Sequence, residues 1–225
     1  MGLLIRGGEV VTAAGRRRAD VWCEGETISR VEPGLSVPPG AEVVEAAGRL
    51  VFPGFVDPHV HAYLPLPGLS AKSDYANCTR AALMGGTTCV MDFAGSGLEK
   101  DLDEAWSVWT AQAEGKASCD YAWHLTITKF DDATRRHLEA YVARGLKSVK
   151  IYLAYKPTLA ISDGALIGLL EFAAEHGVVV MAHCENAELI PVLQRKRLAE
   201  GFTGPEGHAL SRPPMVEAEG VCRFL

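Results

Sequence analysis

The pattern of apolar and polar residues changes at about residue 51. Before that point, short apolar or alternating runs are separated by Gly-Gly, Glu-Gly, Pro-Gly and Pro-Pro-Gly turns, without helical periodicity. We predict an antiparallel β module over residues 1–51, with the basic triplet Arg16–Arg18 in one of its solvated loops. The expected strands are LLIR, EVV, ADVWCE, TISRVE and EVVEA.

Residues 52–225 alternate apolar runs with amphipathic stretches of helical length. Such runs are typical of buried parallel strands, each followed here by a predicted helix. The runs are LVFPGFVD, TTCVMDF, DYAWHLTI, LKSVKIYLAY and GVVVMAH. Right-handed βα units at these spacings build an open doubly wound sheet or a (β/α)8 barrel. Only five units fit before Leu225, whereas a barrel needs eight, so we expect a truncated chain.

Capping residues support the last two predicted helices. Ser162 can cap the helix that Gly177 ends, and Asn186 can cap the next one, which ends before Gly201. The local signals and the apolar periodicity therefore agree on an α/β fold.

The composition restricts the class of protein. With 48% hydrophobic and 22% charged residues, the chain can form a folded core. A formal net charge of −6 without any strongly basic stretch argues against nucleic-acid binding. The longest apolar run, Val178–Ala182, is far shorter than the about 20 residues that cross a bilayer, and MGLLIRGGEV does not resemble a signal peptide. We expect a cytoplasmic protein without membrane or nucleic-acid partners.

The six cysteines are scattered along the chain without a C-x-x-C pair. This pattern predicts buried, reduced thiols. Cys184 follows a histidine, but a role as ligand or nucleophile is the less favoured interpretation.

The segment FPGFVDPHVH contains the clearest candidate chemistry. His59 and His61 are separated by one residue, so an extended backbone presents both imidazoles on one side. They end an apolar strand, which is where barrel enzymes place their catalytic groups. We interpret the pair as metal ligands, against the alternative of two structural surface imidazoles.

His183 closes another predicted strand and should reach the same rim as this pair. On its own it is more typical of a hydrogen-bonded core histidine, but beside His59 and His61 it is a candidate ligand. Three imidazoles suit zinc or a similar divalent ion, which lowers the pKa of bound water towards neutrality.

Lys150 interrupts the apolar strand Val149–Leu153. A buried ammonium is costly without a partner, and a desolvated lysine has a depressed pKa. The resulting free amine can add carbon dioxide and form a carbamate, whose two oxygens can bridge two cations. The alternative is a salt-bridged lysine, or one whose amine extends to solvent.

These residues and their surroundings resemble the cyclic amidohydrolases of the dihydropyrimidinase and D-hydantoinase family. The resemblance runs in order over all 225 residues and corresponds to the N-terminal half of the family's proteins. The motifs that define it are FPGFVDPHVH, AALMGGTT, SVKIYLAYK, AHCENAEL and HALSRP. It implies a (β/α)8 barrel beside a small β-sandwich, with a binuclear zinc centre at the barrel mouth. Residues 1–51 would then be part of the sandwich and residues 52–225 the first five βα units.

The resemblance also implies roles for single residues. His59 and His61 match ligands of the more buried metal, Lys150 matches the N6-carboxylated lysine that bridges two Zn²⁺ ions, and His183 matches a ligand of the second metal. Tyr155 matches a tyrosine that hydrogen-bonds the oxyanion, although a packed rim aromatic is the alternative. A metal-bridging hydroxide opens a cyclic ureide to an N-carbamoyl amino acid in this family, whose members are homo-oligomers, here expected as tetramers.

Some family positions have no counterpart in this sequence. A further metal-binding histidine and a proton-transferring aspartate come from later barrel strands, and His208 matches neither, so we expect the 225-residue chain alone to be inactive. Tyr63 occupies the position where dihydroorotase-like relatives have an arginine for a substrate carboxylate, which favours a neutral ring. The apolar loop Ala62–Pro67 could pack a hydantoin's side group. Asp57 could orient His59, or simply form an Asp-Pro turn.

Two alternative functions are kept. One is an allantoinase-like amidohydrolase. The other is a non-catalytic scaffold of the same fold, which would be expected to lose the histidine pair or the lysine, whereas this sequence retains both.

Overall fold

The computed structural model describes residues 2–65 and 74–225. The chain forms two compact units, Met1–Phe55 and Val56–Leu225. Each unit has its own sheet and is described by itself. The expected loop Ala62–Pro67 is covered as far as Pro65, and its last two residues lie outside the described residues.

The first unit is a mixed sheet. Its strands are β1 (Gly2–Thr12), β2 (Gly15–Glu24), β3 (Thr27–Glu32), β4 (Glu42–Glu45) and β5 (Leu50–Val51). Strands β1, β2 and β3 are antiparallel neighbours, but β4 and β5 both pair in parallel with β1, so the prediction of a purely antiparallel module was wrong. The reason is the long connection over residues 33–41, which lets the chain return in the direction of β1.

The Gly7-Gly8 pair is an irregularity inside one long strand and not the expected turn between two strands. The pairing register of β1 with β2 shifts between Ile5 and Gly8. Gly7 has φ +74°, a left-handed conformation that glycine adopts without strain. Its N–H donates to Asp20 Oδ1 at 2.7 Å, and the N–H of Leu35 donates to Oδ2 at 2.9 Å. The buried Asp20 carboxylate therefore accepts hydrogen bonds from backbone N–H groups that have no partner in the sheet.

Arg16–Arg18 lie in strand β2, where a loop was expected. The three side chains are nevertheless exposed, as predicted, and Arg16 forms an ion pair with Glu9 at 3.3 Å. The three long, charged side chains extend from the strand into solvent. Because a loop was expected after Gly15, the sequence analysis did not predict that the strand begins before them.

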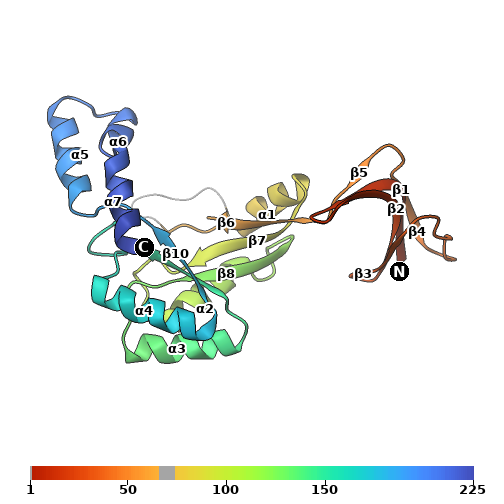
Figure 1. The fold of residues 1–225 in the computed structure, drawn as a ribbon, viewed down its shortest axis with the longest axis horizontal. Helices are drawn as coiled ribbons and strands as arrows, with labels where there is room; N and C mark the ends of the chain where they lie inside the picture. Colours follow the sequence, from red (N-terminus) through yellow and green to blue (C-terminus); the bar gives the residue numbers. More distant parts are fainter. Residues whose placement is uncertain (1, 66–73) are drawn as a thin grey trace. The chain divides into compact units, whose positions relative to one another are not determined.

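The second unit is built on a five-stranded sheet in the order β10-β9-β8-β7-β6 (Figure 1). Strands β7 to β10 pair in parallel, and helices connect successive strands. The expected fold class is confirmed: sequential neighbours joined by helices form the first part of a (β/α)8 barrel, and a separate β-rich unit precedes it in the chain. The strands are β6 (Phe55–Val60), β7 (Thr87–Ala94), β8 (Asp120–Thr126), β9 (Ser148–Tyr152) and β10 (Val179–His183).

Helices α2, α3 and α4 cover one face of this sheet (Figure 1). The main core lies between these helices and the sheet. Trp109, Leu138 and Phe172 from the helices pack there against strand residues such as Leu125 and Ile151. Burial of these large apolar side chains is the main stabilising contribution to the unit. The helices are α1 (Tyr75–Met84), α2 (Leu102–Ala113), α3 (Asp132–Ala143) and α4 (Asp163–His176).

The predicted boundaries of α4 are confirmed, whereas α5 begins at Leu189 with Glu188 as its N-cap, two residues later than a cap at Asn186 predicts. Ser162 caps α4 by accepting from the N–H of Ala165 at 3.4 Å, and Gly177 ends it with φ +63°. The Asn186 side-chain oxygen accepts from the N–H groups of Glu188 and Leu189 at 3.0 and 2.8 Å, at the start of α5.

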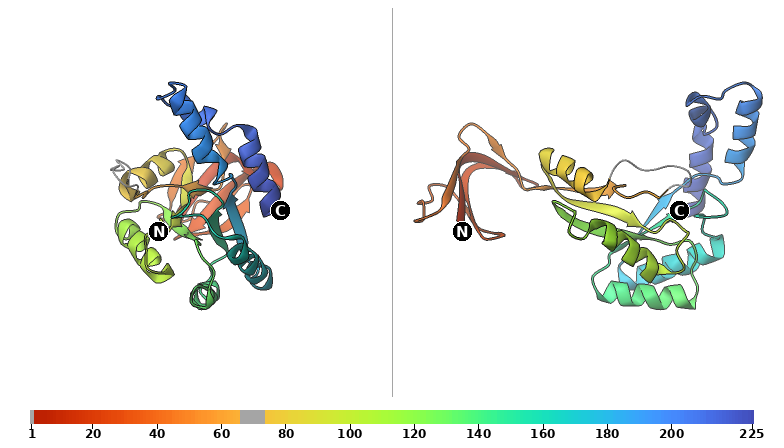
Figure 2. Two further views of the ribbon diagram at one scale, coloured as in Figure 1. Left: turned by 90° about the vertical axis from the view of Figure 1, so that its left-hand side faces the viewer. Right: turned by 180° about the vertical axis from the view of Figure 1, so that it is seen from behind.

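Helices α5 (Leu189–Ala199), α6 (Glu206–Leu210) and α7 (Pro214–Phe224) form a separate group beyond β10 (Figure 2). Ala154, Ile190 and Val216 form a small core here, against which Leu189 and Leu193 pack. The β9–α4 loop, which contains Ala154, is thus fixed against the C-terminal helices.

All six cysteines are free, as expected, but none of them is fully buried. Cys222 is exposed and the other five are half-buried, so the expectation of buried thiols was wrong. Among the described residues, no helix combines the length and the apolar character required to cross a membrane.

We predict that Asp20→Asn lowers the free energy of unfolding by about 2 kcal/mol at pH 7, because one backbone N–H loses a charged acceptor. The two N–H donors lower the pKa of Asp20 below its usual value. Its stabilising effect is therefore present above the unfolded pKa of about 4 and is lost as the pH falls through the lower folded pKa. Urea unfolding of wild type and variant at pH 7 and at low pH measures the difference.

The exposed Glu26→Gln provides the matched control and should leave stability unchanged. A stability difference for Asp20→Asn that stays constant from pH 7 to about pH 2 would contradict this assignment.

Candidate metal centre

The candidate residues lie on the sheet face opposite the core helices. Residues paired across adjacent parallel strands point to the same face. Phe93 pairs with His124, and Tyr152 pairs with His183. Lys150, two residues before Tyr152, shares this face. Figure 1 shows the strand order that brings the carboxyl ends of β6 to β10 to one edge.

His59 and His61 lie together at the end of β6. Their ring centroids are 5.4 Å apart, and both rings contact Phe93, at 4.5 and 5.1 Å between centroids. Partial burial and the nearby positive groups, His59 and Lys150, lower the pKa of His61, which favours a neutral imidazole with a free lone pair. The pair therefore offers two nitrogen donors at one place.

A buried carboxylate that the sequence analysis missed holds the backbone after His61. Asp92 accepts from the N–H groups of Ala62 and Tyr63 at 3.1 and 3.2 Å, and from the hydroxyl of Tyr75 at 2.6 Å. Its side chain is fully buried, and desolvation raises its pKa despite these hydrogen bonds. The available signal was an acidic residue inside the apolar run TTCVMDF.

Lys150 is 7% exposed, and its amine lies between two aromatic rings. Nζ is 5.4 Å from the ring centroid of Phe93 and 5.1 Å from that of Tyr152. In the part of the chain that the structure describes, no carboxylate is within ion-pair distance of it. Desolvation lowers the pKa of this amine, so its neutral, nucleophilic form becomes more accessible.

His183 ends β10 on the other side of Lys150. Its ring centroid is 5.8 Å from that of Tyr152 and 5.0 Å from that of Tyr155. Its Nε2 lies 2.5 Å from Glu185 Oε2. Within residues 2–65 and 74–225, no three His, Cys, Asp or Glu side chains are grouped to hold one metal ion. The three imidazoles thus do not meet at one point, and the lysine lies between the His59–His61 pair and His183.

Tyr155 lies in the β9–α4 loop, beside His183. It has φ +66°, an uncommon conformation for a residue other than glycine, and such strain is frequent at functional sites. Partial burial and the charge of Glu185 raise the pKa of its phenol, so the hydroxyl stays protonated at neutral pH and can donate a hydrogen bond.

Two further polar residues have local structural contacts. Asp57 lies within β6, where the alternative of an Asp-Pro turn does not form, and it accepts from the backbone N–H of His59 at 3.1 Å without a hydrogen bond to the imidazole. His124 was not singled out from the sequence. It uses both ring nitrogens, Nδ1 with Ser148 Oγ at 2.6 Å and Nε2 with the carbonyl of Pro58 at 2.9 Å, which leaves neither free for a metal.

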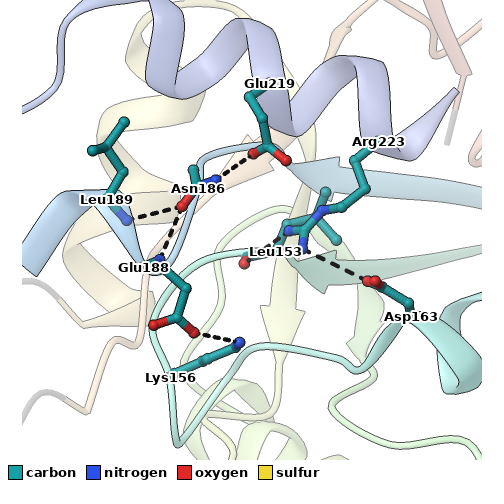
Figure 3. Close-up of polar contacts among 8 residues, drawn as sticks. All are labelled: Leu153, Lys156, Asp163, Asn186, Glu188, Leu189, Glu219 and Arg223. Carbon is teal, nitrogen blue, oxygen red and sulfur yellow. Dashed lines mark hydrogen bonds and ion pairs between the residues drawn. The ribbon is translucent and has the colours of Figure 1, made fainter.

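Helix α7 contacts the loops that follow β9 and β10 (Figure 3). Glu219 accepts from the Asn186 amide at 2.8 Å, and Arg223 donates to the carbonyl of Leu153 at 3.4 Å and approaches Asp163 at 3.6 Å. The loops after β9 and β10 are also connected directly by Lys156 and Glu188, 2.7 Å apart. The site rim therefore depends on residues far along the chain.

Residues 50–210 match the model of the amidohydrolase family, and the chain belongs to this family. It is 38% identical over 221 residues to a D-hydantoinase of Geobacillus stearothermophilus, covering 98% of this chain and 47% of that protein. It is 37% identical over 229 residues to a dihydropyrimidinase of Rattus norvegicus, covering 99% and 44%.

The solved structure of a D-hydantoinase from a Thermus species is 49% identical and superimposes with a TM-score of 0.93, covering 99% of this chain and 48% of that one. An L-hydantoinase from Arthrobacter aurescens, at 21% identity and a TM-score of 0.82, shares the fold. The chain spans about half the length of the relatives that it matches. The resemblance seen in the motifs is thus confirmed for the family and the fold.

We predict that Tyr75→Phe lowers the free energy of unfolding by about 1–2 kcal/mol, because Asp92 loses its hydroxyl donor while it stays buried. Urea denaturation followed by circular dichroism measures the change. The matched control is Tyr121→Phe, whose ring lies 6.3 Å from that of Tyr75 and whose hydroxyl forms no hydrogen bond with the described residues. Equal effects of both substitutions would refute a specific role for the Tyr75 hydroxyl.

Proposed function

We propose that this chain belongs to a metal-dependent hydrolase that opens the cyclic amide bond of a neutral ureide. The central observation is the buried Lys150 amine, which has no carboxylate partner among the described residues and lies between the His59–His61 pair and His183. Membership of the amidohydrolase family and similarity to D-hydantoinases and dihydropyrimidinases support this proposal.

The donor set fits two divalent metal ions, for which we propose Zn²⁺. His59 and His61 would hold one ion and His183 the second. The neutral Lys150 amine would add CO₂, forming a carbamate and releasing one proton, and the two carbamate oxygens would bridge the ions. This reaction replaces an uncompensated amine by an anion between two cations, which agrees with the lowered pKa of Lys150. When bound, the ions supply Lewis acidity and lower the pKa of a coordinated water.

Tyr155 would donate a hydrogen bond from its phenolic hydroxyl to the substrate carbonyl oxygen. Negative charge develops on that oxygen when water adds to the carbonyl carbon, so the hydrogen bond strengthens towards the transition state. A neutral donor suits this role, and the raised pKa of Tyr155 keeps it protonated. Addition of one water and cleavage of the ring C–N bond then give an N-carbamoyl amino acid.

The surroundings of His61 favour a neutral ring with an apolar substituent. A cavity of about 140 Å³ adjoins His61 and Phe93 and is lined mainly by apolar side chains, among them Leu64, Trp109 and Leu159. Tyr63 has no positive charge to pair with a substrate carboxylate. We therefore propose a dihydropyrimidine or a 5-substituted hydantoin as substrate, and an allantoinase-like activity as the second candidate.

We also propose that the enzyme is cytoplasmic and forms a homo-oligomer, with the tetramer as the expected assembly. The non-catalytic scaffold is its competitor from another class of protein. Stoichiometric zinc in the purified protein would favour the hydrolase, whereas a scaffold should bind none.

The Lys150→Ala variant tests the bridging role. We predict that it loses one of the two bound metal ions, because no bridging anion can form, and that acetate or propionate partly restores the second ion by replacing the carbamate. Metal content after gel filtration, measured by atomic emission, is the readout. The control is Lys147→Ala, which removes a lysine from the preceding loop of the same unit. An unchanged metal content in Lys150→Ala would contradict the bridge.

The polypeptide of residues 1–225 is also predicted to hydrolyse neither dihydrouracil nor hydantoin when purified alone. The family's further histidine and proton-transferring aspartate match no residue of this sequence, so a metal site here would lack its base. Formation of the N-carbamoyl product, followed by chromatography, is the measurement. Turnover that survives purification and is abolished by Lys150→Ala would overturn this prediction while supporting the metal centre.

A further inference from the structure

Glu185 is a shielded carboxylate that the proposed reaction does not use. It lies two residues after His183, and its side chain is only 13% exposed. One of its oxygens, Oε2, is 2.5 Å from His183 Nε2. The other, Oε1, is 3.3 Å from Arg212 Nε. Glu185 thus connects the candidate ligand to an arginine that is far away in the sequence.

Arg212 belongs to the HALSRP motif, for which the metal centre itself gives no role. Its side chain is 15% exposed and lies in the connection between α6 and α7. Nη1 is 3.3 Å from Ser211 Oγ and 3.2 Å from His208 Nδ1, so hydrogen bonds within its own segment fix the guanidinium, and its contact with Glu185 is an ion pair. A guanidinium is always charged at neutral pH and can compensate a shielded carboxylate.

The backbone around Glu185 is fixed as closely as its side chain. A Cβ added to Gly220 of α7 would lie 2.6 Å from the carbonyl carbon of Cys184 and 2.8 Å from the nitrogen of Glu185. The N–H of Asn186 donates to the carbonyl of Val216 at 3.0 Å. Helix α7 therefore packs directly on the segment 184–186, and Glu185 has little freedom to leave His183.

We propose that Glu185 is a positioning residue that holds His183 in its Nε2–H form, and that Arg212 holds Glu185. A neutral imidazole has one N–H and one lone pair, so donation from Nε2 to the carboxylate leaves Nδ1 as the metal-binding atom. Acceptors behind metal-bound histidines fix the tautomer and the ring orientation in this way. The inference rests on the proposed function for the identity of His183 as a ligand.

The first measurement needs no metal. In the metal-free chain with ¹⁵N-labelled histidine at pH 9, long-range ¹H–¹⁵N spectra report which imidazole nitrogen is protonated. We expect His183 as the Nε2–H tautomer in the wild type and a loss of this preference in Glu185→Gln. The matched control is Glu200→Gln, which removes the same charge from another carboxylate–arginine pair, Glu200 Oε2 with Arg197 Nη1 at 2.6 Å. Its His183 signals should equal those of the wild type.

The second measurement is zinc affinity, determined by competition with a chromophoric chelator. Affinity should fall about 10- to 100-fold in Glu185→Gln and stay unchanged in Glu200→Gln. Arg212→Gln should reduce it by a smaller factor, because Glu185 remains but is less well held. Circular dichroism identifies any variant that fails to fold.

The outcomes separate this inference from the proposed function. An Nδ1–H tautomer of His183 in the wild type would overturn the inference whatever the variants do, and so would an unchanged zinc affinity in Glu185→Gln. A wild-type chain that binds no zinc would contradict the proposed metal centre, and the tautomer measurement would still decide the role of Glu185.

Discussion

The burial of one amine constrains the chemistry of this sheet face. Lys150 lies in a strand whose other side packs into the core through Val149 and Ile151, so the strand cannot rotate to expose it. On the inner face the amine meets aromatic rings, which stabilise a cation only weakly compared with a carboxylate. The charged form is therefore disfavoured where it lies, and the residue is stable there as a neutral nucleophile or as part of a compensated cluster. The imidazoles on both sides of Lys150 are the side chains with which it could form such a cluster.

Precision at such a site requires that the ends of the strands do not move. The imidazoles of the candidate site lie at the carboxyl ends of β6 and β10, where ladder hydrogen bonding stops and the backbone would otherwise be free, whereas Lys150 lies within β9 and is held by its strand pairing. Asp92 supplies acceptors for the segment after His61, and α7 supplies donors and acceptors for the segments after β9 and β10. The same hydrogen bonds stabilise the fold and fix the positions of the strand ends, because buried backbone groups need partners in any case.

The sequence predicted those features that depend on local periodicity. Strand β9 and the cap and stop of α4 follow from residues within one element, and the structure agrees. The direction of β4 and the bulge at Gly7 depend on partners elsewhere in the chain, so a Gly-Gly pair looked like a turn. The same division applies to the site. His59, His61, Lys150 and His183 stand out because each is a polar residue in or directly after an apolar strand. Asp92 has the same local signal, but its role depends on partners such as Ala62, 30 positions away in the sequence. The roles of these four residues as metal ligands stay proposals, because the chemistry of a set of metal-binding side chains depends on which ion it binds.

The link from His183 through Glu185 to Arg212 shows how a motif outside the reaction can still affect it. Local interactions alone would leave a carboxylate beside His183 free to turn to solvent, since Glu185 follows the end of the strand. The α6–α7 connection places a permanent positive charge on its far side, and Gly220 lets the helix backbone approach closely enough to hold the loop. The orientation of one imidazole thus depends on packing that forms only after three helices have followed β10. A change in that packing would act on the proposed metal site without touching any residue proposed to bind metal.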